Sequence, residues 1–132
     1  MKAYVLDEAG SVENLILKEL EEPSPKADEV LVEVKAISIN PVDVKVRPAE
    51  EVLNMLVGTE RPVILGWDIA GTVAAVGESV TQFEPGDSVF GMVNFPGHGK
   101  GYAERVAAPE NHLAKCLQIH LLKKPQRPRL QP

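Results

Sequence analysis

The sequence contains a single cysteine, Cys116, among 132 residues. One thiol cannot form a disulfide within the chain, and it cannot build a cysteine-rich zinc lobe. No apolar run approaches the roughly 20 residues that a membrane-spanning helix needs. The first residues also lack the apolar core of a secretion signal. These absences predict a cytoplasmic protein that does not bind a membrane.

Basic residues are fewer than acidic ones. The chain has 14 Lys and Arg residues against 19 Asp and Glu, which gives a formal net charge of -5. Surfaces that bind nucleic acid need clustered positive charge, so we expect no nucleic-acid partner. The 44% of hydrophobic residues is ordinary, and the length is sufficient for one domain with a buried core.

Short alternating segments predict a protein built mainly from strands. In the segment 30–36, Val30, Val32 and Val34 share one face, while Glu33 and Lys35 face water. The predicted strands are 2–6, 15–19, 30–36, 63–65, 69–76, 89–90, 102–108 and 112–115, and the predicted helical turns are 41–47 and 50–56. Many short strands joined by Gly/Pro turns indicate a mainly β fold, a partly open barrel with short helices.

The stretch from Pro62 to Met92 is the most distinctive part of the sequence. Its strand 69–76 has very small residues at positions 70, 71, 74 and 75, so it must lie close to another backbone. The segment 84–87, Glu-Pro-Gly-Asp, has the composition of a tight turn, because Pro presets φ and Gly accepts positive φ.

This stretch resembles the signature of the medium-chain dehydrogenase/reductase superfamily. The matching residues are Gly66, Asp68, Gly71, Val73, Val76, Gly77, Pro85, Gly86, Asp87 and Val89. The resemblance covers residues 1–115 and implies the superfamily's N-terminal catalytic domain, with a chaperonin-10-like (GroES-like) β-barrel core. It agrees with the strand pattern.

The resemblance also indicates which branch of the superfamily to expect. In the zinc alcohol dehydrogenases, a Cys and a His hold a catalytic zinc, and these positions fall at Asn40 and Trp67 here. Amides and indoles do not replace thiolate and imidazole as zinc ligands, so we expect no bound metal. The remaining histidines, His98, His112 and His120, lack ligand spacing.

The zinc-independent branch, with its quinone oxidoreductase-like and enone reductase-like proteins, carries Asn-Pro-x-Asp at this place. The resemblance implies that Asn40 lies beside the nicotinamide and ribose of the cofactor, where its amide offers a donor and an acceptor. The alternative is that Asn40 only caps a helix beginning at Pro41, and both roles are compatible. Lys45 is expected to polarise a substrate carbonyl, with a solvated surface lysine as the alternative.

Neighbouring residues allow two roles each. Trp67 could contact the cofactor and wall a pocket for a flat quinone or enone, or it could belong to the core. Asp43 is expected to be a helix-start anion or to pair with Arg47. Asp68 is expected to accept backbone hydrogen bonds, and Tyr102 to pack.

The function implied is reduction of quinones or conjugated carbonyls by NADPH. The superfamily adds a Rossmann domain with a Gly-rich phosphate turn, which this sequence lacks, because 97–101 (GHGKG) has the wrong spacing. We therefore expect the chain alone to bind no NADPH and to be inactive.

The alternatives are a zinc alcohol dehydrogenase relative that lost its ligands and a non-enzymatic GroES-like interaction module. Substrate, NADH or NADPH preference and oligomeric state, a homodimer included, stay open.

The last residues, 116–132 (CLQIHLLKKPQRPRLQP), do not continue the domain pattern and contain no acidic residue. Relatives continue with Met-Pro-Ser-Asn and later with Glu-Glu and a run of alanines. A one-base shift at the Lys115 codon can convert that continuation into this tail. We therefore expect an aberrant, frameshifted and disordered tail, of natural or cloning origin, which sequencing of the gene would test.

Overall fold

The computed structural model describes residues 1–116. The predicted tail, from residue 117 onward and including His120, lies outside the described residues. Within residues 1–116 no helix is long and apolar enough to cross a membrane.

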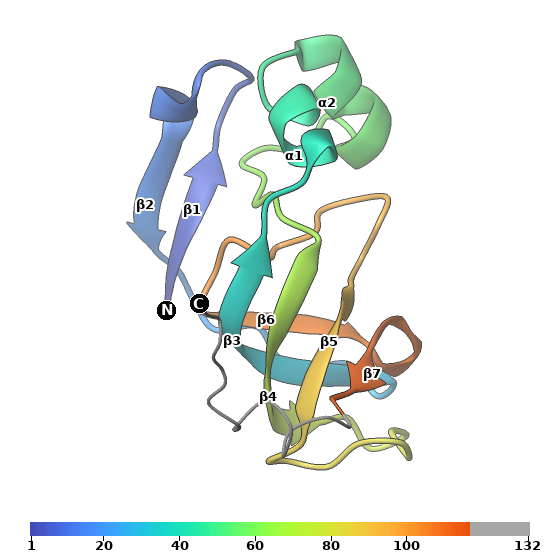
Figure 1. Ribbon diagram of the computed structural model, residues 1–132. Coiled ribbons are helices and arrows are strands. Elements are labelled where there is room, and N and C mark those ends of the chain that lie inside the picture. Colours follow the sequence, from blue (N-terminus) through green and yellow to red (C-terminus); the bar gives the residue numbers. More distant parts are fainter. Residues whose placement is uncertain (117–132) are drawn as a thin grey trace, which may run out of the picture.

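Two antiparallel sheets form the framework of the structure (Figure 1). The smaller sheet is a hairpin of β1 (Lys2–Leu6) and β2 (Leu15–Glu19), with the 3-10 turn η1 (Val12–Asn14) between them. The larger sheet has the order β6-β3-β4-β5-β7. Its members are β3 (Glu29–Ser38), β4 (Asp68–Val76), β5 (Ser88–Met92), β6 (Arg105–Pro109) and β7 (Ala114–Lys115). A second 3-10 turn, η2 (Glu110–His112), precedes β7.

Within residues 1–116 the two sheets share no paired strands and form no closed barrel, and β1 is joined to loop residues instead. Isolated bridges join Ala3 to Ala103 and Leu6 to Val63. The helices, α1 (Pro41–Val46) and α2 (Glu50–Val57), lie together at the end of the molecule where β3 ends and β4 begins (Figure 1). The predicted fold class is therefore confirmed: mainly β, open, with a few short helices.

Two apolar clusters form the core. The larger one lies on the five-stranded sheet and is built mainly from valines of β3, β4, β5 and β6. The second lies under the helices, where Val46 of α1 and Leu53 of α2 pack with Trp67. Full burial of each such side chain contributes about 1.5–3 kcal/mol. The second cluster thus fixes the helices against the start of β4.

Most predicted elements are confirmed, some with shifted bounds, and one is wrong. The first two strands have the predicted bounds, and both helices are present. The predicted strand 63–65 does not form: Val63 makes only a bridge to Leu6, and the carbonyls of Ile64 and Leu65 accept from loop residues Lys100 and Tyr102. The predicted strands 102–108 and 112–115 are each shorter than expected at the N-terminal end.

The expected close approach of small residues in β4 is confirmed at Gly71. A Cβ atom at Gly71 would lie 2.1 Å from the carbonyl oxygen of Glu33 on β3. The register of β3 against β4 shifts beside this position, between Val34 and Ala36. Only a residue without a side chain allows the two strands to approach in this way.

Candidate functional site

Asn40 lies at the junction between β3 and α1. Its backbone is extended, with φ -115° and ψ 166°, and Pro41 begins the helix. The Asp43 carboxylate oxygen Oδ2 accepts a hydrogen bond from the Asn40 backbone N–H at 2.7 Å. Asn40 therefore occupies the N-cap position of α1, but its side chain forms no capping hydrogen bond, and the cap is made by the Asp43 carboxylate on the Asn40 N–H.

The side chain of Asn40 reaches across to β4. Its Nδ2 donates to Oδ2 of Asp68 at 2.6 Å, and Ser38 Oγ lies 3.2 Å from its Oδ1. Ser38 and Asp68 are register partners at the paired ends of β3 and β4. The expectation that Asp68 accepts backbone hydrogen bonds is wrong, because the bond found for its carboxylate comes from the Asn40 amide.

Asp43 is the buried polar residue of this region. Its side chain is 3% exposed, and within residues 1–116 its Oδ1 has no hydrogen-bond partner. Burial raises the pKa of Asp43, and the negative charge of Asp68 adds to this, while the bond from Asn40 N–H opposes it. The expected pairing with Arg47 is not found, since Arg47 Nε donates to the Gly10 carbonyl at 3.2 Å.

Lys45 lies in the last turn of α1 and is exposed. A cation at this end of a helix interacts favourably with the backbone dipole. Within residues 1–116 its ammonium group forms no ion pair. The structure thus leaves this donor accessible to a ligand or to water, and its catalytic role stays a prediction.

Trp67 is almost completely buried, with 1% of its surface exposed. Its Nε1 donates to the Gly97 carbonyl at 2.9 Å, and its ring meets that of Phe95 edge-on, with centroids 5.4 Å apart. These contacts favour the core role over contact with a cofactor. Tyr102, expected to pack, does so against Gly66, and burial followed by the Asp43 charge raises the pKa of its phenol.

Two hollows open beside these residues. One, of about 410 Å³, is lined by residues of β3, β4 and β5, among them Phe90, Met92 and Asp68. The other, of about 390 Å³, is mostly apolar and is lined by Tyr4, Ile39 and Asp43 among others. Both can accommodate an apolar group close to the polar cluster of Asn40, Asp43 and Asp68.

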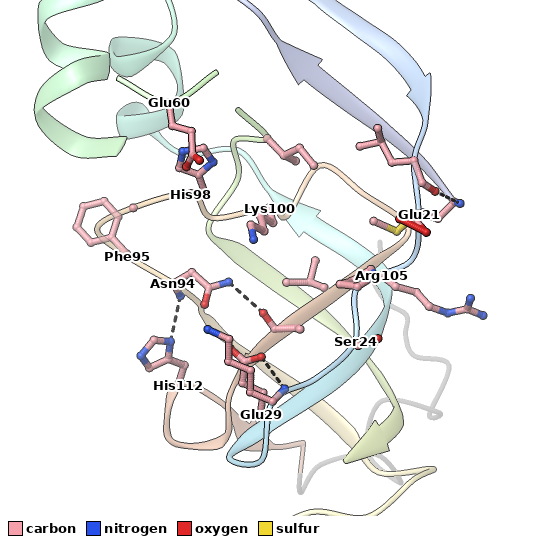
Figure 2. A pocket seen from close by; sticks show the side chains of 18 of the residues that line it. Glu21, Ser24, Glu29, Glu60, Asn94, Phe95, His98, Lys100, Arg105 and His112 are labelled. Carbon is pink, nitrogen blue, oxygen red and sulfur yellow. Dashed lines mark hydrogen bonds between the residues drawn. The ribbon is translucent and has the colours of Figure 1, made fainter. Parts of the chain in front are cut away.

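The largest cavity, of about 630 Å³, lies elsewhere, against the loop that follows β5 (Figure 2). The Asn94 backbone N–H donates to Nδ1 of His112 at 3.0 Å on its wall. Burial lowers the pKa of His98, and the positive charges of Lys100 and Arg61 act in the same direction, against Glu60. Neither Asn40, Lys45 nor Trp67 lines this cavity.

Comparison with known sequences decides the family. Residues 26–119 match the alcohol dehydrogenase GroES-like domain. The chain belongs to this family. A zinc-type alcohol dehydrogenase-like protein of Staphylococcus aureus is 41% identical over 99 residues, which are 71% of this chain and 28% of that protein. The quinone oxidoreductase of Sus scrofa is 39% identical over 89 residues, or 67% of this chain and 25% of that protein.

Solved structures agree with this assignment to the GroES-like family. The quinone oxidoreductase from Coxiella burnetii superposes with a TM-score of 0.83 at 32% identity, over 89% of this chain and 37% of that chain. The Escherichia coli quinone oxidoreductase complexed with NADPH gives a TM-score of 0.75 at 25% identity, over 87% of this chain and 33% of that chain. The chain therefore spans less than two-fifths of the length of these relatives, and it matches their N-terminal part.

The structure shows what donors Asn40 and Trp67, the two positions at which zinc ligands were considered, can offer. Asn40 presents an amide that is bonded to Asp68, and Trp67 presents an indole that is bonded to Gly97. Neither group is a usual zinc ligand. Within residues 1–116, no three His, Cys, Asp or Glu side chains are grouped so that they could share a metal ion.

Sequence reasoning identified Asn40 but missed how it is held. The bond to Asp68 spans 28 residues of sequence and depends on the register of β3 against β4, which no local pattern reveals. The burial of Asp43 was also missed. A usable signal existed for its helix-start position, because an acidic residue three positions after Asn40 fits a capping box.

Proposed function

We propose that this chain is the N-terminal catalytic-domain part of an NADPH-dependent oxidoreductase that reduces quinones or conjugated carbonyls. The observation that carries the proposal is the fixed amide of Asn40 at the place where zinc-dependent relatives would have a cysteine. The bond from this amide to Asp68, together with the bond from the Asn40 backbone N–H to Asp43, builds a polar site that needs no metal. Relatives named quinone oxidoreductase, in sequence and in structure, support the same interpretation.

The residues present fit the nicotinamide end of the cofactor. Asn40 Oδ1 accepts one bond from Ser38, and a carbonyl oxygen has two lone pairs, so it can accept a second bond from a ligand. When bound, the cofactor supplies a hydride to the β-carbon of the unsaturated carbonyl. Lys45 is exposed on the same short helix, where its ammonium group can donate to the carbonyl oxygen as negative charge develops on it.

The phosphates of the cofactor require a further domain in this proposal. Binding of a dinucleotide normally uses backbone N–H groups at a Gly-rich turn between a strand and a helix. Within residues 1–116 every strand pair is antiparallel, so the described part has no such βαβ unit. We therefore expect the chain alone to bind NADPH more weakly than micromolar, which calorimetric titration would measure.

Isotope transfer tests the proposed reaction. A two-domain form would be made by joining residues 1–115 to the cofactor domain of the Coxiella burnetii quinone oxidoreductase. It would be incubated with NADPH deuterated at the reactive C4 position and with an enone. The proposal predicts deuterium at the β-carbon of the product. Turnover of a saturated alcohol with no reaction on enones or quinones would contradict it, provided that a melting curve shows a folded chimaera.

The relatives named zinc-type alcohol dehydrogenase-like favour one further candidate, a member of that branch that lost its ligands. Elemental analysis separates the two candidates. We expect no stoichiometric zinc in the purified chain, whereas zinc near one atom per chain that is lost in Asn40→Ala would favour the zinc-type candidate. Native mass spectrometry addresses the non-enzymatic interaction module, which would form a ring of several copies.

A further inference from the structure

The side-chain amide of Asn40 can point in only one direction. Its Nδ2 lies 2.6 Å from Oδ2 of Asp68, and a carboxylate oxygen can only accept hydrogen bonds. The reverse orientation would place the Oδ1 atom of Asn40 against this oxygen, with no proton between them. Bonds between an N–H and an ionised carboxylate are short and strong, as this distance indicates.

Two further polar groups of Asn40 are also engaged. Its backbone N–H is bonded to Oδ2 of Asp43 at 2.7 Å, and Ser38 Oγ is the donor to its Oδ1 at 3.2 Å. The second lone pair of Oδ1 and the second N–H of Nδ2 are left for a ligand or for water. The two carboxylates of Asp43 and Asp68 thus occupy one donor of the amide side chain and the donor of the backbone.

We propose that Asp68 is a positioning residue that fixes the Asn40 amide with its Nδ2 toward this carboxylate, so that Oδ1 is presented to a ligand group carrying an N–H or O–H donor. The inference rests on the proposed function, in which this group is the carboxamide N–H or a ribose hydroxyl of the nicotinamide cofactor.

The orientation can be read by NMR from the full 132-residue chain labelled with nitrogen-15, without any turnover. We expect one side-chain N–H proton of Asn40 to resonate downfield of the ordinary amide range and to exchange slowly with water. In Asp68→Ala this proton should return to the ordinary range, whereas Glu78→Gln, at an exposed position, should leave it unchanged. An Asn40 amide that is ordinary in the wild type, or unaffected by Asp68→Ala, would overturn the proposal.

If Asp68→Ala does not fold, the bond can be tested instead by exchanging the amide and the carboxylate between positions 40 and 68. Asn40→Asp alone sets two carboxylates against each other, and its melting temperature should fall and should recover on acidification. Asp68→Asn alone replaces a charged bond by a neutral one. The double variant Asn40→Asp/Asp68→Asn restores a donor–carboxylate pair of opposite polarity, so its melting temperature should exceed that of Asn40→Asp. Simple addition of the two losses would contradict the assigned bond.

Selection of a donor is tested with two ring compounds at millimolar concentration. Nicotinamide carries a carboxamide N–H, whereas 3-acetylpyridine has the same ring and a methyl ketone without a donor. We expect nicotinamide to shift the Asn40 resonances and 3-acetylpyridine to leave them in place, and in Asp68→Ala this preference should disappear. Equal shifts from both compounds, or none from either, would overturn donor selection. Because hydride transfer is not measured, this outcome is independent of the deuterium experiment on the proposed reaction.

Discussion

The indole Nε1 of Trp67 donates a hydrogen bond to the carbonyl oxygen of Gly97, 2.9 Å away and 30 residues further along the chain. This bond joins the start of β4 to the loop that follows β5. A Cβ atom at Gly99 would lie 2.7 Å from the Trp67 ring, so the loop packs directly on the indole. Trp67 therefore supports the loop and the helix-side core.

Trp67→Phe should destabilise the chain by about 1–3 kcal/mol. The change leaves the Gly97 carbonyl without its donor and leaves a small void in the core. Urea unfolding followed by circular dichroism measures this loss. Phe90→Leu serves as the control, because Phe90 is 50% exposed, and its effect should stay within about 0.5 kcal/mol. Equal stability of Trp67→Phe and wild type would show that the indole bond contributes nothing.

Gly71→Ala should lower the free energy of unfolding by about 3 kcal/mol, because one methyl group forces β3 and β4 apart. The added Cβ would lie 2.1 Å from the Glu33 carbonyl oxygen, which belongs to the backbone and cannot rotate away. Thermal melting checks this expectation. Ala74→Val adds bulk at an exposed position of the same strand and should change stability by no more than about 0.5 kcal/mol. A stable Gly71→Ala would mean that the two strands can separate easily.

Several features of the fold could be predicted from the sequence because they arise from local patterns. The alternation of residues 15–19 and 30–36 and the small residues around Gly71 predict strands and a close strand approach, and all are present. The Asn40-Pro41 pair predicts the start of a helix at Pro41, where α1 begins. These signals depend on a few neighbouring residues.

Other features depend on how distant segments meet. Val63 is β-branched, as is typical of strand residues. The backbone carbonyls of the next two residues, however, accept hydrogen bonds from the loop before β6 and not from a neighbouring strand. The link from Asn40 to Asp68 follows from the register of two strands, and the burial of Asp43 follows from packing around α1. Sequence patterns therefore indicated which residue types lie at the candidate site, but not which of their atoms already form hydrogen bonds within the protein.

Asp43 predicts how stability depends on pH. Its pKa is raised in the folded state above the ordinary value of 3.8, mainly by burial, so the folded state binds this proton more tightly than the unfolded state does. Stability linked to Asp43 is therefore greatest below pH 3.8 and falls as the pH rises through the folded-state pKa. Denaturant unfolding of the wild type relative to Asp43→Asn should show this fall.

The comparison with Asp43→Asn removes the contributions of other groups. Burial lowers the pKa of His98, and the bond to Lys35 lowers that of Glu33, and both residues are present in the two proteins. The amide introduced by Asp43→Asn keeps an oxygen that can accept from the Asn40 backbone N–H. A difference in stability that is constant across the acidic range would show that Asp43 titrates in the folded chain as it does in the unfolded one.

Lys45 gives the sharpest kinetic prediction, to be measured in a two-domain form that turns over. An ammonium group that donates to a carbonyl oxygen binds the developing negative charge of the transition state more strongly than the neutral carbonyl. Lys45→Met keeps most of the apolar stem and removes the donor, so kcat should fall by about 10²–10³ while KM changes little.

Lys35→Met is the matched control, because Lys35 is also exposed but pairs with Glu33 on β3. It should leave both constants unchanged. If kcat is unaffected by Lys45→Met, Lys45 is a solvated charge at the helix end, and the next candidate donor to the carbonyl is the second side-chain N–H of Asn40, because Asp68 engages only one.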